Sequence, residues 1–289
     1  MKIVVTGASG LIGTELLRQL RDHTDDNNIE VIPLSRSEKD GLVCTDYSVE
    51  SLSQIFDGAD VIIHLAARRG AAEQYTQFQE NDFVTENILR AMKAAKVKRI
   101  IFMSSISVYS SQHDLPWSEE QHPIPQTFYA LSKLAGEGLC QLYARKGISY
   151  TIFRCAIVLG LENSGRMLST FVRQAANGER ISLRGKSEAK RDFIYVKEAA
   201  RALIWAIFEE HAENQIYNLG SNEQYTNLEV AQRINKVFAN EGNLDYDDTV
   251  KEKVTDSYMD SSKLYKAGYV PKYHFESALL DIREEYKKR

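Results

Sequence analysis

The 289-residue sequence predicts a doubly wound α/β fold, a parallel sheet with helices on both faces, followed by a smaller α/β lobe. Short, almost continuously apolar runs occur at regular intervals in the first half of the chain, and amphipathic segments separate them. A glycine-rich turn joins the first run to the first amphipathic segment. Strands of this kind are expected where helices cover both faces of a parallel sheet.

The elements of the first half alternate in order along the chain. The predicted strands are 2–6, 31–34, 61–65, 99–104 and 149–154. The predicted helices are 11–22, about 49–56, a long one ending near 95, and about 127–146. A loop containing Pro116, Pro123 and Pro125 separates the fourth strand from the last of these helices, because proline disrupts both helices and central strands.

After residue 160 the alternation becomes less regular. Short strands are expected at 192–196 and 216–219, and helices at about 167–176, 197–210 and 226–239. We therefore divide the chain into a doubly wound domain (1–160) and a smaller lobe (161–289), with a crossing between them near 190–220. Because ligands of open α/β sheets bind beyond the carboxyl ends of the strands, the site is expected between the two parts.

Composition excludes several classes of function. The net charge of −4 and the pI near 5.9 argue against binding of nucleic acid or anionic membranes. Short basic clusters such as Arg68-Arg69 are expected to be solvated surface. The odd set Cys44, Cys140 and Cys155 has no CxxC pair, which favours reduced thiols, and the scattered histidines predict no metal site. Without a signal peptide or a membrane-length apolar run, a cytoplasmic protein is expected.

The segment TGASGLIG places three glycines between the first strand and the first helix. Gly7 would permit the tight turn, Gly10 would let the backbone approach a pyrophosphate, and Gly13 would allow close helix–strand packing. The helix N-terminus then offers free N–H groups to the phosphates. The alternative is a tight turn without a ligand, but the position at the first strand–helix junction favours a cofactor. The other predicted cofactor contacts in this loop are Ser9, Leu11 and Ile12.

The end of the second strand indicates which dinucleotide is bound. Ser35, Arg36 and Ser37 occupy the corner where a carboxylate would bind the ribose 2′-hydroxyl of NAD and an arginine the 2′-phosphate of NADP. Glu30 lies at the wrong end of the strand to serve. Arg36 therefore favours NADP, with NAD and an arginine stacked on adenine as the alternative.

Ser105, Tyr129 and Lys133 form the candidate catalytic set. Ser105 follows the fourth strand, and Tyr129 and Lys133 share one face of the next helix at spacing i, i+4. No other tyrosine of the chain has a lysine four residues later. Each signal alone has an ordinary explanation, a strand-end cap for Ser105 and a packed tyrosine beside a lysine for the pair. Together on one lobe they predict chemistry.

The chemistry expected of this set is hydride transfer coupled to proton transfer. A phenol has an ordinary pKa of about 10, and a nearby ammonium and an oxidised nicotinamide would both favour the phenolate. Tyr129 would then move the proton of a substrate hydroxyl, and Ser105 would hydrogen-bond the same oxygen. Lys133 would contact both Tyr129 and the cofactor.

These motifs resemble the extended short-chain dehydrogenase/reductase superfamily, and within it the NAD-dependent epimerase/dehydratase family. TGASGLIG, HLAA (64–67), NDFVTENIL (81–89), MSSISVYS and YALSK are similar to its motifs in the first part. KRDFIYVKEAA (190–200), YNLGSNEQYTNLEVA (217–231) and MDSSKLYKAGYVPKY (259–273) are similar to those of its substrate lobe. The resemblance implies a dinucleotide-binding Rossmann domain with the catalytic residues at 1–160 and a smaller nucleotide-sugar-binding lobe at 161–289. The sequence looks most like small bacterial UDP-sugar 4-epimerases.

The resemblance also implies roles for single residues. Asp46 and Tyr47 would meet the adenosine, and Leu65, Ala66 and Ala67 would line the cofactor. Asn81 would lie near Lys133 through a water molecule. Arg191 would hold the diphosphate of a nucleotide sugar, with Ser105 and Tyr129 at the sugar; a salt bridge with Asp192 is the alternative for Arg191.

Two departures from the family pattern narrow the expected reaction. Ser104-Ser105-Ile106 replaces the Thr-Asp-Glu triplet of the 4,6-dehydratases, which argues against dehydration, and Leu159 replaces an aromatic residue, which alters the sugar contacts. The leading prediction is a UDP-sugar 4-epimerase. The alternatives are an NADPH-dependent 4-ketoreductase and a catalytically idle NADP-binding scaffold. The family also implies a homodimer through the helix at about 81–95 and the catalytic helix.

Overall fold

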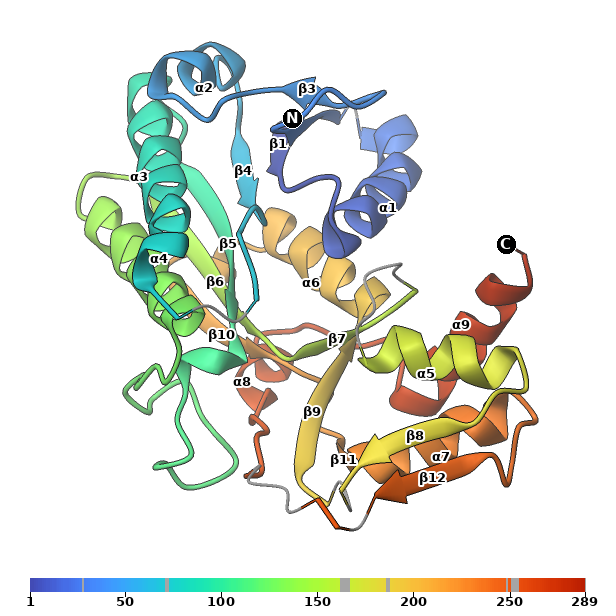
Figure 1. The fold of residues 1–289 in the computed structure, drawn as a ribbon. Helices are drawn as coiled ribbons and strands as arrows, with labels where there is room; N and C mark the ends of the chain where they lie inside the picture. Colours follow the sequence, from blue (N-terminus) through green and yellow to red (C-terminus); the bar gives the residue numbers. More distant parts are fainter. Residues whose placement is uncertain are drawn as a thin grey trace.

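The computed structural model describes residues 1–27, 29–70, 73–161, 167–185, 188–247, 249–250 and 255–288. Within these residues the main sheet has seven parallel strands in the order β10-β6-β5-β4-β1-β2-β3, so the predicted doubly wound fold is confirmed (Figure 1). Its strands are β1 (Lys2–Thr6), β2 (Glu30–Ser35), β3 (Val43–Cys44), β4 (Val61–His64), β5 (Arg99–Ser105), β6 (Ser149–Cys155) and β10 (Gln215–Leu219).

Helices cover both faces of this sheet (Figure 1). On one face, Ile3 and Val5 of β1 pack with the residues of α1 and α6, and on the other face Val4 packs with those of α2, α3 and α4. This division follows from the alternation of side chains along a strand. The helices are α1 (Leu11–Asn27), α2 (Val49–Ile55), α3 (Gln79–Ala94), α4 (Phe128–Ala144) and α6 (Val196–Phe208).

Helix α4 packs closely on the sheet. A Cβ added at Gly136 would come within 2.5 Å of the Phe102 ring on β5, so only glycine allows this approach. Thr127 caps the helix by accepting the N–H of Ala130 at 3.1 Å, which fixes where its first turn begins. The cap places Tyr129 in the first turn, beside the carboxyl ends of the strands.

The remaining elements form a smaller part beside the main sheet (Figure 1). It contains a three-stranded sheet in the order β11-β9-β7 and a two-stranded sheet of β8 and β12. β10 and α6 come from the second half of the chain but belong to the main sheet and its cover. The smaller part contains β7 (Ile157–Leu159), β8 (Ile181–Arg184), β9 (Lys190–Tyr195), β11 (Gln224–Thr226), β12 (Leu244–Asp247), α5 (Met167–Ala176), α7 (Asn227–Val237) and α9 (Phe275–Lys287). The short helix α8 (Ser262–Lys266) contacts β10 of the main sheet. The described chain also has 3₁₀ turns at η1 (Tyr75–Gln77), η2 (Ile106–Val108) and η3 (Glu210–Ala212).

Candidate functional site

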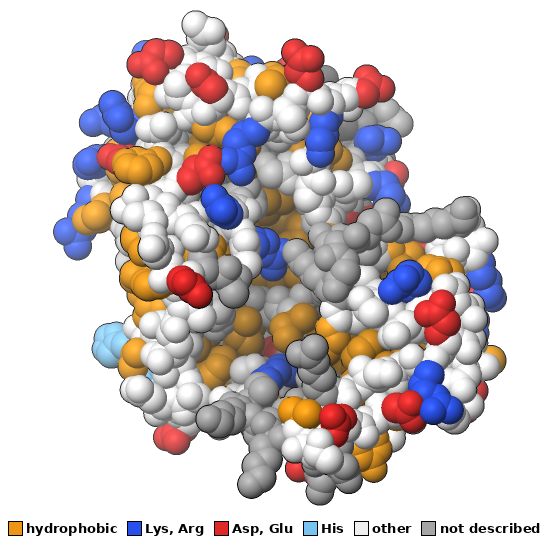
Figure 2. Space-filling model, viewed as in Figure 1, with side chains coloured by type: hydrophobic (Ala, Val, Ile, Leu, Met, Phe, Trp, Pro, Cys, Tyr) orange, Lys and Arg blue, Asp and Glu red, His pale blue; other side chains and the backbone are white. Residues whose placement is uncertain are grey.

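A cavity of about 740 Å³ opens at the carboxyl ends of β1, β4, β5 and β6, and the space-filling view shows it as a hollow between the two parts (Figure 2). The order of the main sheet reverses between β1 and β4, which is the switch point where open α/β sheets bind ligands. Most of the residues predicted for the site line this cavity: Gly7, Ser9, Gly10, Leu11, Ile12, Gly13, Ser35, Arg36, Ser37, Tyr47, Leu65, Ala66, Ala67, Ser105, Tyr129 and Lys133.

The glycine loop is packed too tightly for other residues. Gly7 has a φ of +68°, and a Cβ there would lie 2.6 Å from the backbone nitrogen of Ala66. A Cβ at Gly13 would lie 2.4 Å from the carbonyl oxygen of Gly7. The loop therefore lies directly against the end of β4, at the N-terminus of α1. This cradle of backbone groups fits the pyrophosphate of a dinucleotide.

The corner after β2 holds an ion pair that sequence reasoning missed. Arg36 lines the cavity and donates a hydrogen bond to the carboxylate of Glu80, on α3. Both side chains are about half exposed, at 54% and 47%. Glu80 was not predicted because 44 residues separate it from Arg36, and only the packing of α3 brings them together.

Tyr47 and Asp46 are neighbours in the chain but differ in position. Tyr47 is buried at the cavity wall in the left-handed region, with a φ of +60°. Asp46 is exposed, lies outside the cavity lining, and accepts the N–H of Ser48 at 2.8 Å. Hydrogen bonding from the backbone and the side chain of Ser48 lowers the pKa of Asp46. The predicted contact of Asp46 with adenine stays a prediction.

His64 fixes the end of β4 beneath the cavity. The buried ring bonds Thr6 through Nδ1 at 2.8 Å and Thr85 of α3 through Nε2 at 3.0 Å. Thr6 Oγ1 in turn accepts the backbone N–H groups of Leu65 and Ala66, both at 3.2 Å. Burial, aided by the charge of Lys133, lowers the pKa of His64 to about 3. The neutral imidazole is therefore part of the fold and holds the cavity floor in place.

This buried histidine predicts acid sensitivity. In the unfolded chain His64 takes up a proton near pH 6.5, whereas in the folded chain it does so near pH 3. The neutral ring therefore stabilises the fold at neutral pH, and this stability is lost as the pH falls. Through His64, the free energy of unfolding should fall by about 2 kcal/mol as the pH is lowered from about 7.5 to about 5. Urea denaturation at both pH values measures it. His64→Gln should be less stable at neutral pH but lose less on acidification; an equal loss in both proteins contradicts the assignment.

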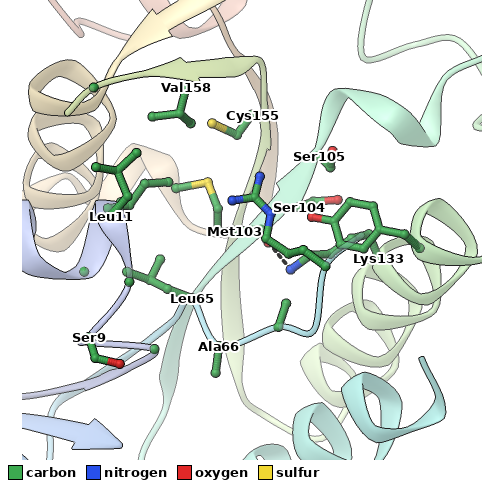
Figure 3. A pocket seen from close by; sticks show the side chains of 18 of the residues that line it. Ser9, Leu11, Leu65, Ala66, Met103, Ser104, Ser105, Lys133, Cys155 and Val158 are labelled. Atoms are coloured by element: carbon green, nitrogen blue, oxygen red, sulfur yellow. Dashed lines mark hydrogen bonds between the residues drawn. The ribbon is translucent and has the colours of Figure 1, made fainter. Parts of the chain in front are cut away.

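Ser105 and Lys133 meet the cavity from different elements (Figure 3). Ser105 ends β5, and its Oγ accepts the N–H of Ser107 at 3.2 Å. It therefore caps the end of the strand, as the ordinary explanation held, and it also lines the cavity. Lys133 is 4% exposed, and its Nζ donates to the carbonyl of Met103 at 2.7 Å. Tyr129 lies one turn before Lys133, and its ring packs against the ring of Phe78 with the two ring centroids 6.1 Å apart.

The electrostatics of the phenol differ from the sequence expectation. Burial raises the pKa of Tyr129, while the charge of Arg69 and hydrogen bonding to Arg69 and Ser105 act to lower it. Burial, followed by the charge of Arg69, lowers the pKa of Lys133 to about 7. Burial also raises the pKa of Cys155 to about 12, so this thiol of the cavity wall stays neutral.

Arg69 is a cavity residue that the motifs of the sequence do not assign to the site. It is exposed, as expected for a short basic cluster, and it also lines the cavity. The available signal was its position, because it lies two residues after HLAA, in the loop that follows β4. Charge runs are usually solvated, and that general rule outweighed the position.

Asn81 and Arg191 lie outside the cavity lining. Asn81 is buried; its Oδ1 accepts the N–H of Arg68 at 2.7 Å, and its Nδ2 donates to Ser132 Oγ at 3.1 Å, which ties the loop after β4 to α4. Arg191 of β9 donates to the carbonyl of Thr255 and to Ser257 Oγ. Their predicted contacts with cofactor and substrate stay predictions.

A buried ion pair anchors α4 to the sheet. Glu137 of α4 and Arg154 of β6 are 2% and 3% exposed and lie 2.8 Å apart. Ser104, next to Ser105, donates to the same carboxylate, and Arg154 donates to the hydroxyl of Tyr109 at 2.9 Å. The network thus links the two elements that carry Ser105 and Lys133.

Within the described ranges, no three His, Cys, Asp or Glu side chains gather where they could hold a metal ion. In the same ranges, no helix is both long and apolar enough to cross a membrane.

Comparison with known proteins assigns the chain to a family. Residues 3–220 match the NAD dependent epimerase/dehydratase family. A putative UDP-glucose 4-epimerase of Methanocaldococcus jannaschii is 29% identical over 99% of this chain and 96% of its own length. The crystal structure of UDP-N-acetylglucosamine 4-epimerase from Bacillus cereus superposes with a TM-score of 0.91 at 33% identity, covering 99% of this chain and 96% of that one.

Relatives with other reactions also match over nearly the whole length. A dTDP-glucose 4,6-dehydratase of Streptomyces niveus is 24% identical over 99% of this chain and 93% of its own. The matches therefore establish the family and do not single out one of its reactions. The chain belongs to the NAD dependent epimerase/dehydratase family.

Proposed function

We propose that this chain is a cytoplasmic nucleotide-sugar 4-epimerase that uses NADP or NAD. The observation that carries the proposal is the meeting of Ser105, Tyr129 and Lys133 with the glycine loop around one cavity. The tight cradle at Gly7 and Gly13 fits a dinucleotide pyrophosphate, as described above. The similarity to UDP-sugar 4-epimerases supports a UDP-sugar as the substrate.

In the proposed mechanism each residue has one task. Tyr129 takes the proton of the sugar C4 hydroxyl, and Ser105 hydrogen-bonds the same oxygen as it becomes a carbonyl. The bound nicotinamide supplies a reversible hydride acceptor at C4. Lys133 orients the dinucleotide beside Tyr129. After the keto sugar has presented its other face, Tyr129 returns the proton to the C4 oxygen of the epimer.

A 4-ketoreductase is the second candidate, because it needs the same residues and Arg36 in the cavity suits the 2′-phosphate of NADPH. We propose that the chain is not a 4,6-dehydratase. Elimination of water needs an acid and a base near the sugar, and none of the described residues lining the cavity is Asp or Glu. Intact Ser105, Tyr129 and Lys133 argue against an idle scaffold.

The test of the reaction is direct. Purified protein should interconvert UDP-glucose and UDP-galactose, or their N-acetylated forms, with no net change in the absorbance of the reduced nicotinamide. Consumption of one NADPH for each 4-keto sugar reduced would instead establish the reductase.

The cofactor corner gives a prediction about specificity. Arg36→Asp should weaken NADP binding by roughly 10- to 100-fold, since a charge-assisted hydrogen bond is lost and a repulsive charge is added. Glu80→Gln should have the opposite effect, because it frees Arg36 and removes the carboxylate that holds it. Dissociation constants for both dinucleotides measure the changes. If neither variant alters the ratio of the two constants, Arg36 does not bind the 2′-phosphate.

We also propose that the chain is a homodimer through α3 and α4, as the family resemblance implies. This face carries exposed apolar side chains, among them Phe83 at 63% and Leu142 at 53%. Sedimentation should give twice the chain mass of 32.8 kDa. Phe83→Glu should yield monomers, whereas Phe208→Glu, an exposed phenylalanine of α6, should not. A wild-type monomer, or a dimer that survives Phe83→Glu, contradicts this interface.

A further inference from the structure

We propose that Ser107 is a positioning residue that fixes the hydroxyl of Ser105 as a hydrogen-bond donor to the C4 oxygen of the sugar. The proposal deepens the proposed function and rests on it in one respect, that the C4 oxygen of a substrate meets Ser105. Ser105 lines the cavity (Figure 3), whereas Ser107 lies outside the cavity lining. Ser107 therefore acts through Ser105 and not on the substrate itself.

Two hydrogen bonds from Ser107 end on the same oxygen atom of Ser105. Ser105 ends β5 in an extended conformation and caps the 3₁₀ turn η2, where its Oγ accepts the backbone N–H of Ser107 at 3.2 Å. Serine side chains commonly accept the N–H two residues later in such turns. The hydroxyl of Ser107 donates a second hydrogen bond to the same Oγ, at 2.9 Å.

These two bonds determine what the Ser105 hydroxyl can still do. A serine hydroxyl has two lone pairs that accept hydrogen bonds and one hydrogen that donates. The N–H and the O–H of Ser107 occupy both lone pairs of Ser105 Oγ, so its hydrogen remains for a ligand. The hydroxyl of Ser104, which also lines the cavity, already donates to the carboxylate of Glu137. Ser105 therefore offers the cavity a donor and Ser104 does not.

A donor at this point matches the charge that the proposed reaction develops. The C4 hydroxyl loses its proton to Tyr129, and its oxygen becomes a carbonyl that can only accept a hydrogen bond. A donor that already points at this oxygen stabilises the transition state without first having to turn. The electrostatics of the site agree with this direction, because hydrogen bonding to Ser105 acts to lower the pKa of Tyr129, as a donor to the phenolate does.

The kinetic test is the variant Ser107→Ala. It frees one lone pair of Ser105 Oγ, so the Ser105 hydroxyl is no longer restricted to donating. We expect kcat to fall about three- to tenfold, the effect of one neutral hydrogen bond. KM should stay nearly constant, because the bond strengthens as charge develops on the C4 oxygen. Ser107→Thr keeps the hydroxyl and should retain most of the wild-type kcat.

A matched control and a double variant make the result specific. Ser110 is buried outside the cavity lining, and its Oγ accepts the N–H of Gln112 at 3.1 Å in a similar turn, so Ser110→Ala should leave kcat unchanged. In a protein that carries Ser105→Ala, adding Ser107→Ala should have no further effect on kcat, because Ser107 acts only through the missing hydroxyl. Thermal melting checks that each variant is folded.

Neutron diffraction from crystals grown in heavy water shows the hydroxyl directions without any turnover. We expect the deuterium of Ser107 to point at Ser105 Oγ and the deuterium of Ser105 to face the cavity. A Ser105 deuterium that points at Ser107 overturns the proposal. An unchanged kcat in Ser107→Ala overturns it as well, and so does an equal fall of kcat in the Ser105→Ala protein.

Failure of the proposed function gives a different result. A wild-type protein that converts neither UDP-sugars nor 4-keto sugars contradicts the proposed function, whereas the neutron map needs no substrate. If turnover is absent but the two deuterium atoms lie as expected, the donor role of Ser105 stands and only the assigned reaction is wrong.

Discussion

Replacing Tyr129 with phenylalanine is expected to lower kcat by about 10²- to 10⁴-fold while leaving the fold intact. The substitution removes the one oxygen proposed to carry the substrate proton, and this range is typical for loss of a general acid–base group. The ring remains and keeps its contact with Phe78. Steady-state kinetics over a range of pH would show both the lower rate and the loss of the pH dependence that Tyr129 contributes.

A matched control is available for this variant. Tyr246 is 54% exposed on β12 and does not line the cavity, so Tyr246→Phe should leave kcat unchanged. If Tyr129→Phe turns over as fast as the wild type, another group transfers the proton and the catalytic assignment of the cavity fails.

Removing Glu137 should have the largest effect on stability. In Glu137→Ala the guanidinium of Arg154 remains buried without its carboxylate, and breaking a buried ion pair in this way costs about 3–5 kcal/mol. Ser104 loses its acceptor as well. Urea denaturation at neutral pH measures the loss as a lower midpoint at constant slope.

A double variant separates an unpaired charge from poor packing. Glu137→Leu combined with Arg154→Met removes both charges, and pairs replaced by apolar residues of similar size are often nearly neutral. We therefore expect it to be more stable than Glu137→Ala. A loss of less than about 1 kcal/mol in Glu137→Ala would show that the pair is far better solvated than its burial indicates.

Much of the fold could be predicted from sequence because its signals are local. The apolar runs at 2–6, 61–65 and 99–104 correspond to β1, β4 and β5, and the glycine spacing marks the turn between β1 and α1. The strand at 216–219 was also expected, but nothing in its sequence showed that it pairs with β6 in the main sheet. The pairing of this strand with β6 is decided by tertiary packing.

The site was predictable only where its chemistry has a fixed spacing. Tyr129 and Lys133 follow helical periodicity, and Ser105 ends a strand, so topology alone brings them to one edge. Glu80 lies in a segment that carries no such pattern. Its partner Arg36 is 44 residues distant in the chain, and their contact exists only once α3 has packed on the sheet.

The central claim, transient oxidation at C4, is tested most directly by following the hydrogen on that carbon. A UDP-sugar carrying deuterium at C4 is incubated with the protein and the catalytic amount of cofactor that saturates it, and the products are analysed by NMR and mass spectrometry. We expect the C4 epimer to form with the deuterium still on C4, because the hydride leaves and returns without exchanging with water. Formation of the epimer without the label, or no epimer together with net oxidation of reduced cofactor by a 4-keto sugar, would contradict the assignment as an epimerase.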